Sequence, residues 1–209
     1  MGVRLCGFIA LTIFSMTSMD FSARLRYTLR VAKLFSYFRY CLLPHHIIPG
    51  VIELDSALLI ARGIRGVMLD LDNTLAPWHS QELFPGVEEW VAELYAAGLR
   101  ACVVTNARTT DRVRPVALRL GIPWVTSAYK PLTRGFRRAM ELMGTLPETT
   151  AMVGDLISLD VFGGNRLGVF TVLVQPKVVW DEDLPTRLLL RPLDRCIRGL
   201  CRHRKPSSR

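Results

Sequence analysis

The apolar positions of the chain form two kinds of pattern, continuous runs and residues at helical spacing. Runs without alternation, typical of strands covered on both faces, occupy residues 67–69, 99–104, 122–125, 150–153 and 168–174. Apolar residues at helical spacing lie between them, over residues 84–98, 109–120 and 131–143. Strands that alternate with single helices predict an α/β fold, in which a parallel sheet is covered by helices on both faces.

A basic helix and an apolar segment precede this alternating region. Residues 20–40 have a helical pattern with basic side chains on one face, namely Arg26, Arg30 and Lys33. Pro44 and Pro49 interrupt the following segment, residues 42–52, which stays strongly apolar. This segment has two interpretations, an arm packed over the domain or a surface that contacts a membrane.

The C-terminal tail is again basic and amphipathic. A helix projected from residue 191 places apolar residues on one side: Leu193, Cys196, Ile197, Leu200 and Cys201. Its basic residues fall on the opposite side: Arg191, Arg195, Arg198 and Arg202. We expect either contact with an anionic surface or packing on the domain. The chain should therefore divide into an N-terminal extension (1–41), a main domain (42–180) and a basic tail (181–209).

The net charge of +9 belongs to the two ends of the chain. Residues 1–44 carry six lysines and arginines against one acid, and residues 185–209 carry eight against one. The middle of the chain is therefore net negative. Basic ends favour an anionic partner, either a membrane surface or a nucleic acid. Solvated tails without a partner are the alternative.

The cysteines and the N-terminal residues give information on the cellular compartment of the protein. The five cysteines are an odd number without metal-ligand spacing, which favours reduced thiols in a cytosolic compartment. Neither they nor His45 and His46 have the spacing of a zinc site. The apolar residues 5–14 are too short to span a bilayer. A signal-peptide core, a peripheral anchor and a translation start at Met16 or Met19 all stay open.

Side chains with metal or phosphate chemistry follow four consecutive predicted strands: Asp70 and Asp72, Thr105 and Asn106, Lys130, and Asp155 and Asp160. Because the carboxyl ends of parallel strands meet at one edge of a sheet, we expect these side chains to lie together. Clustered carboxylates without sulfur ligands suit a hard cation such as Mg²⁺, whereas a hydroxyl and an ammonium suit phosphate oxygens. An Asx turn at Asp72 is the structural alternative, but it does not account for Asp70.

These motifs resemble those of the haloacid dehalogenase (HAD) superfamily of phosphatases. Its first motif, Asp-x-Asp-x-Thr, stands here at residues 70–74, and the other three match Thr105, Lys130, and Asp155 with Asp160. Residues 70–75, 130–131 and 154–166 are similar to subclass IIIA, of the phosphatidylglycerophosphate phosphatase type, and the likeness covers about residues 42–180. Leu156 and Leu159 stand where a typical member has glutamine and threonine. That departure concerns hydrogen bonds around the carboxylates, and leaves the carboxylates themselves intact.

The resemblance implies a Rossmann-like three-layer α/β/α core and a Mg²⁺-dependent phosphomonoester hydrolase. Asp70 would be the nucleophile that forms an aspartyl-phosphate, and Asp72 the general acid and then the general base. Four acids would serve the metal: Asp70, Asp72 through its carbonyl, Asp155, and Asp160, which would support the metal through water or pair with Lys130. The phosphoryl oxygens would be bound by Thr105, Asn106 and Lys130.

The connections between these motifs have room for about one helix each, so no cap domain is expected over the site. An uncapped site suits a bulky or surface-embedded substrate. The resemblance and the basic ends together favour hydrolysis of phosphatidylglycerophosphate to phosphatidylglycerol at an anionic membrane surface. This predicts a cytoplasmic protein, peripheral at the inner face of a membrane, with nucleic acid disfavoured as a partner. A phosphatase for a nucleic-acid end, a phosphoprotein or a soluble phosphate, and a non-catalytic scaffold, are the alternatives.

Overall fold

The computed structural model describes residues 20–175 and 184–201. The apolar residues 5–14 and the basic residues beyond Cys201 lie outside this part of the chain. The chain divides into two units, Met1–Tyr40 and Cys41–Arg209. The second unit contains the sheet and every predicted site residue. The predicted domain boundaries at residues 41 and 180 stay predictions.

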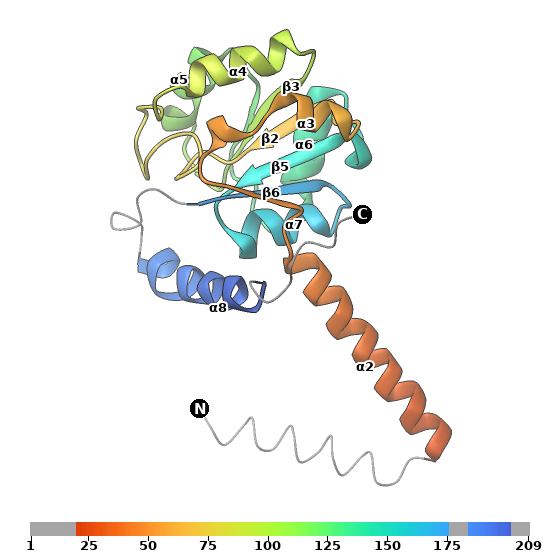
Figure 1. The fold of residues 1–209 in the computed structure, drawn as a ribbon. Helices are drawn as coiled ribbons and strands as arrows, with labels where there is room; N and C mark the ends of the chain where they lie inside the picture. The colour runs from red at the N-terminus through yellow and green to blue at the C-terminus, as the bar shows by residue number, and fades with distance from the viewer. Residues whose placement is uncertain (1–19, 176–183, 202–209) are drawn as a thin grey trace. The chain divides into compact units, whose positions relative to one another are not determined.

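A six-stranded parallel sheet forms the centre of the second unit (Figure 1). Its strands are β1 (His46–Ile48), β2 (Gly66–Leu69), β3 (Arg100–Val104), β4 (Trp124–Val125), β5 (Thr150–Gly154) and β6 (Phe170–Val174). In space they follow the order β1-β6-β5-β2-β3-β4, and all neighbours are parallel. Leu69 is in register with Val103 on one side and Val153 on the other. The carboxyl ends of β2, β3 and β5 are therefore nearly level.

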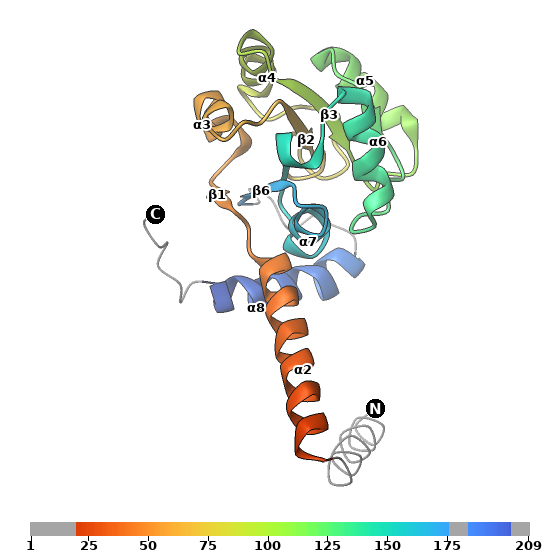
Figure 2. The ribbon, with the colours of Figure 1, turned by 90° about the vertical axis from the view of Figure 1, so that its right-hand side faces the viewer.

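Helices cover both faces of the sheet (Figures 1 and 2). The first layer consists of α3 (Ser56–Ala61), α4 (Val87–Ala96) and α5 (Thr110–Leu120). It packs on Val67, Leu69 and the strand residues that face the same way. The second layer includes α6 (Thr133–Met143), which packs on Met68 and its neighbours, and the short α7 (Phe162–Asn165). The inner strands β2, β3, β5 and β6 thus bury both faces, which explains their apolar runs without alternation.

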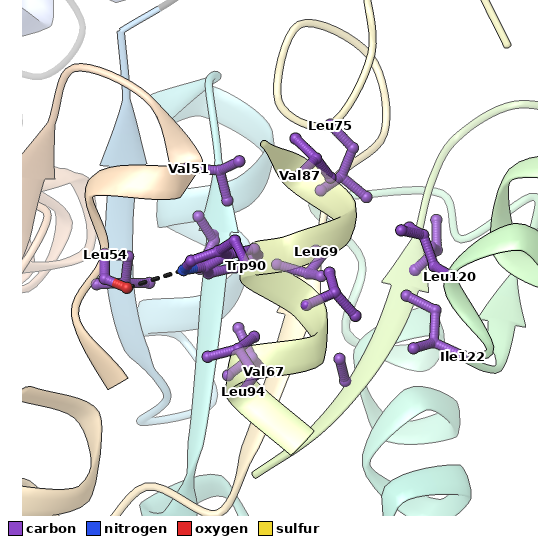
Figure 3. Packing of buried hydrophobic residues seen from close by; sticks show 14 of the residues in the cluster. Val51, Leu54, Val67, Leu69, Leu75, Val87, Trp90, Leu94, Leu120 and Ile122 are labelled. Carbon is purple, nitrogen blue, oxygen red and sulfur yellow. Dashed lines mark hydrogen bonds between the residues drawn. The ribbon is translucent and has the colours of Figure 1, made fainter. Parts of the chain in front are cut away.

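Trp90 of α4 lies at the centre of the larger core (Figure 3). Its indole Nε1 donates a 2.9 Å hydrogen bond to the carbonyl oxygen of Leu54, just before α3. An aromatic side chain of this size buries a large apolar area, and its polar atom needs a partner when buried. Trp90 therefore fixes α4 against both the sheet and the segment that leads into α3.

The predicted parallel α/β fold is confirmed, with two differences of detail. Residues 42–52, for which the sequence leaves packing and membrane contact open, form the edge strand β1 and the 3₁₀ turn η1 (Val51–Glu53). Ile48 and Val51 are buried there, so this segment packs on the domain. The helix expected to begin at Pro131 begins at Thr133, because Leu132 is still extended. Between β2 and β3 the chain forms a single α-helix, α4.

Both predicted end helices are present. The helix expected over residues 20–40 is α2 (Phe21–Leu42). The C-terminal region forms a π-helical turn, η4 (Thr186–Leu190), which continues into α8 (Arg191–Cys201). Over residues 20–175 and 184–201, no helix combines the length and the apolar character that crossing a bilayer requires.

The orientation of α8 differs from the prediction. Ile197 is buried in a small cluster as expected, with Ile157, Val161 and Leu173. Arg191 and Asp194 are buried as well, at 5% and 2% exposure, whereas Leu193 is 50% exposed. The predicted separation of an apolar side, with Leu193, from a basic side, with Arg191, is therefore wrong at these two residues, because Arg191 is buried and Leu193 is exposed. Buried charged groups need charged or hydrogen-bonding partners, and the helix is oriented by those partners as well as by its apolar residues.

We expect Gly135→Ala to destabilise the domain. Gly135 lies in α6 against the loop that carries Lys130, and a Cβ atom there would come within 2.7 Å of the Ala128 backbone. Overpacking of this kind lowers the free energy of unfolding by about 1–3 kcal/mol. Chemical denaturation measures the loss. Gly199→Ala is the matched control, because no atom lies within 4 Å of its Cβ position; equal denaturation midpoints for the two variants would contradict the packing.

Candidate active site

The sheet order brings the predicted motifs to one edge. Asp70 follows β2, Thr105 follows β3 and Asp155 follows β5, and β2 lies between the other two strands. The Asp70 N–H donates a 2.9 Å hydrogen bond to the Val153 carbonyl, so pairing with β5 continues up to the first carboxylate. The site therefore lies beyond the carboxyl ends of the central strands, where open α/β sheets bind ligands.

A tight loop follows Asp70 and brings Asp72 back towards it. Asn73 has a φ of 57°, in the left-handed region that asparagine tolerates better than most residues. Its N–H donates a 2.7 Å hydrogen bond to the Ala76 carbonyl, which closes the turn. Oδ1 of Asp72 accepts a 3.1 Å hydrogen bond from the His79 N–H. The turn thus holds the Asp72 carboxylate close to the end of β2, where Asp70 lies.

Lys130 connects the first and last motifs. Its Nζ lies 2.5 Å from Oδ1 of Asp70 and 2.7 Å from Oδ1 of Asp160. Burial alone would lower the pKa of Lys130, but the neighbouring charges of Asp160 and Asp70 raise it above its ordinary value. The lysine is therefore a permanent cation in the site. Its position suits a phosphoryl oxygen brought next to Asp70.

Asp160 is held tightly on the turn after β5. Its Oδ2 accepts a 3.1 Å hydrogen bond from the Leu156 N–H, and its Oδ1 pairs with Lys130. Gly154 is required directly beneath it, because a Cβ atom there would collide with the Asp160 carboxyl group. The backbone of Leu156 thus supplies a hydrogen bond that does not depend on the side chain at that position.

Three buried carboxylates could hold a metal ion. Asp70, Asp155 and Asp160 each offer an oxygen, and these oxygens all lie within 4.8 Å of one another. The donor set contains only carboxylate oxygen, which fits Mg²⁺. Burial raises the pKa of Asp70 well above its ordinary value, against the opposing charge of Lys130. Burial likewise raises the pKa of Asp155 to about 7, although Arg191 opposes the shift. The site thus favours additional positive charge.

Thr105 and Asn106 organise the loop after β3. Oγ1 of Thr105 accepts a 3.1 Å hydrogen bond from the Ala107 N–H, and the side chain is buried. The Asn106 amide bonds the backbone of Lys130 twice, donating to its carbonyl and accepting from its N–H. In this arrangement Asn106 positions Lys130, while its predicted contact with phosphate stays a prediction.

The sequence analysis missed one residue at the rim of the site. Arg112, in the first turns of α5, makes a bidentate ion pair with Asp72 at 2.6 and 2.7 Å. Both side chains are mostly buried, at 14% and 13% exposure. The sequence could have indicated Arg112, because it lies near the start of the helix that follows the Thr105 strand. In a parallel α/β sheet such helices begin at the edge where ligands bind.

A second group of missed residues comes from α8. The Arg191 guanidinium donates to Oδ2 of Asp155, and Arg198 Nη2 lies 3.0 Å from the Asp155 carbonyl oxygen. Asp194 accepts hydrogen bonds from the N–H groups of Ile157 and Ser158 at 2.6 and 3.1 Å. No local pattern predicts these contacts, because more than thirty residues separate the partners along the chain.

The match to a family model decides the classification. Residues 50–168, more than half of the chain, match the model of haloacid dehalogenase-like hydrolases. The chain belongs to this family. The matched residues contain all four motifs and the whole carboxylate cluster.

Several curated relatives agree with this family. The chain is 34% identical over 134 residues to the protein named "Probable phosphatase YqeG" of Bacillus subtilis (strain 168), covering 64% of this chain and 77% of that protein. It is 32% identical over 148 residues to phosphatidylglycerophosphate phosphatase 1, chloroplastic, of Chlamydomonas reinhardtii, covering 67% and 55%. The Arabidopsis thaliana chloroplastic/mitochondrial enzyme of that name is 25% identical over 161 residues, covering 73% and 46%. The chain thus spans about half the length of these two enzymes. The predictions of the family and of a phosphatase are confirmed.

A pH-dependent effect of Mg²⁺ on stability follows from Asp155. In the metal-free folded protein the pKa of the Asp155 carboxyl group is raised to about 7. In the unfolded chain the same group has its ordinary pKa of 3.8. The folded state therefore holds more protons between these values, and the contribution of Asp155 to stability falls as the pH rises through this window. Bound Mg²⁺ offsets that loss, so we expect it to stabilise the protein more at about pH 8 than at about pH 5.

Thermal melting with Mg²⁺ or EDTA measures this effect. Stabilisation of about 2.7 kcal/mol is expected when Mg²⁺ is about a hundred times its dissociation constant. Asp155→Asn is the control that should lose most of the response. An equal shift in melting temperature at both pH values would contradict the role of buried carboxylates.

Proposed function

We propose that this protein is a Mg²⁺-dependent phosphomonoester hydrolase that works through an aspartyl-phosphate on Asp70. The observation that carries the proposal is the cluster of Asp70, Asp155 and Asp160 at the carboxyl edge of the sheet, with Lys130 between two of them. Such a cluster is costly unless a ligand uses it. Magnesium, held by Asp70, the Asp72 carbonyl and Asp155, would supply charge to stabilise the phosphoryl oxygens.

The residues of the chain divide the reaction into two displacements. Asp70 attacks phosphorus, and Asp72 gives a proton to the leaving oxygen. Asp72 then accepts a proton from the water that hydrolyses the acyl-phosphate. In the structure Arg112 engages both oxygens of Asp72, so this ion pair opens before Asp72 takes up the proton that it gives to the leaving oxygen. Lys130 and Thr105 bind the phosphoryl oxygens, and Asp160 holds Lys130 in place.

The proposed substrate is phosphatidylglycerophosphate. Two of the relatives carry that activity in their names. The uncapped edge of the sheet leaves room for a substrate that stays embedded in a lipid surface. The basic residues of the N-terminal helix and of the tail would attract anionic lipid, at about 1 kcal/mol for each lysine or arginine near the surface. The protein would then be peripheral to the membrane on its cytoplasmic side.

Asp70→Asn should abolish turnover and preserve the fold. The amide has the same shape as the carboxylate but cannot attack phosphorus, so we expect activity to fall below about one part in a hundred. Phosphate release and circular dichroism provide the two measurements. Glu89→Gln, which makes the same chemical change on the exposed side of α4, should retain full activity. Appreciable turnover by Asp70→Asn would rule out Asp70 as the nucleophile.

A substrate panel tests the proposed lipid specificity. Phosphate release is compared for phosphatidylglycerophosphate in anionic vesicles, a nucleotide, a sugar phosphate and a phosphopeptide, each with Mg²⁺ and with EDTA. We expect the lipid to be hydrolysed with the highest kcat/KM and all activity to stop in EDTA. Preference for a soluble phosphate would overturn the lipid assignment and keep the phosphatase. Unchanged activity in EDTA would overturn the metal assignment.

A further inference from the structure

The C-terminal helix reaches the carboxylate cluster through its polar side. Arg191, at 5% exposure, donates to Oδ2 of Asp155, and the second guanidinium nitrogen lies 3.4 Å from the Asp155 carbonyl oxygen. Arg198 adds a 3.0 Å hydrogen bond to that carbonyl. Two cations from α8 therefore converge on one aspartate, the residue that directly follows β5.

The helix is also fixed to the turn that follows Asp155. Asp194, at 2% exposure, accepts hydrogen bonds from two successive N–H groups, those of Ile157 and Ser158. Ile197 packs on Ile157 in the adjoining apolar cluster. Figures 1 and 2 show α8 next to α7 below the sheet edge. The position of Arg191 is thus set by polar contacts on one side and apolar packing on the other.

The hydrogen bonds of the carboxylates leave one oxygen free on each of two acids. The described contacts of the Asp155 side chain go to Oδ2, and those of the Asp70 side chain go to Oδ1, which pairs with Lys130. Within residues 20–175 and 184–201, Oδ1 of Asp155 and Oδ2 of Asp70 have no hydrogen-bond partner. Arg191 therefore contacts one carboxylate oxygen of Asp155, and Lys130 contacts one carboxylate oxygen of Asp70. In both acids the other oxygen is available to a ligand.

Each of the four acids of the site has at least one cation in contact with it. The acids are Asp70, Asp72, Asp155 and Asp160, and the cations that contact them are Lys130, Arg112, Arg191 and Arg198. A divalent cation and a phosphomonoester dianion would add equal and opposite charge. Arg191 therefore does not need to leave for both to bind.

We propose that Arg191 is a positioning residue for the metal site, and that α8 is part of the active site. By engaging Oδ2 of Asp155, Arg191 orients the carboxylate so that Oδ1 is presented to Mg²⁺, while Asp194 and Arg198 hold α8 in register with the β5 loop. This inference rests on the proposed function, because it assigns the metal to the same cluster. Groups that orient a metal ligand commonly contribute a factor of about 10 to 100 in metal affinity.

The test measures Mg²⁺ binding to the full-length chain by isothermal titration calorimetry, without substrate. Arg191→Gln should raise the dissociation constant for Mg²⁺ by about 10 to 100-fold. Arg191→Lys keeps the charge but lacks the planar fork, so it should restore part of the affinity. Arg195→Gln removes the same charge from the exposed side of the same helix and should leave the affinity within about twofold of the original.

Circular dichroism shows whether each variant folds. If Arg191→Gln does not fold, Asp194→Asn takes its place, because it weakens the anchor of α8 and leaves Arg191 present; it should lower Mg²⁺ affinity in the same direction. Unchanged or tighter Mg²⁺ binding by the folded variant would overturn the inference, the latter by showing that Arg191 competes with the metal. Absence of Mg²⁺ binding by the unaltered chain would instead overturn the proposed function, so the two failures are distinguishable.

Discussion

The structure depends on the burial of carboxylates at the carboxyl edge of the sheet. Asp155 and Asp160 are each 1% exposed, and Asp70 is 7% exposed. Isolated charges at such burial are strongly unfavourable. The surrounding elements therefore supply cations: Lys130 precedes α6, Arg112 lies on α5, and Arg191 and Arg198 lie on α8. Three helices from different parts of the chain are tied to the same edge by this requirement.

Most of the fold could be predicted because it depends on local patterns. Apolar runs marked five of the six strands, β2 to β6, and helical spacing marked α4, α5 and α6. The four motifs could be placed as well, since each directly follows a strand and parallel strands end together. The sequence did not reveal β1, whose three residues are too few to show a period. It also did not reveal the first residue of α6, which depends on the loop conformation at Leu132.

The parts that could not be predicted are long-range ion pairs. Arg191 and Arg198 have the sequence pattern of a solvated basic face, and their partner Asp155 lies in another motif. The burial of Arg191 follows from tertiary contacts that no periodicity encodes. Leu156 stands where a typical member of the family has glutamine. The bond to Asp160 comes from the backbone N–H of Leu156, which every residue except proline has, so this bond does not depend on the side chain. The contact that holds the Asp160 carboxylate is thus compatible with leucine at position 156.

The most direct test of the central claim is to locate the phosphoryl group on the enzyme during turnover. The full-length protein is mixed with phosphatidylglycerophosphate and Mg²⁺, quenched in acid, digested, and analysed by peptide mass spectrometry. The account predicts a phosphoryl group on Asp70 that is absent from protein mixed without substrate. Turnover with the phosphoryl group on another side chain, or with none on Asp70 at any quench time, would contradict it.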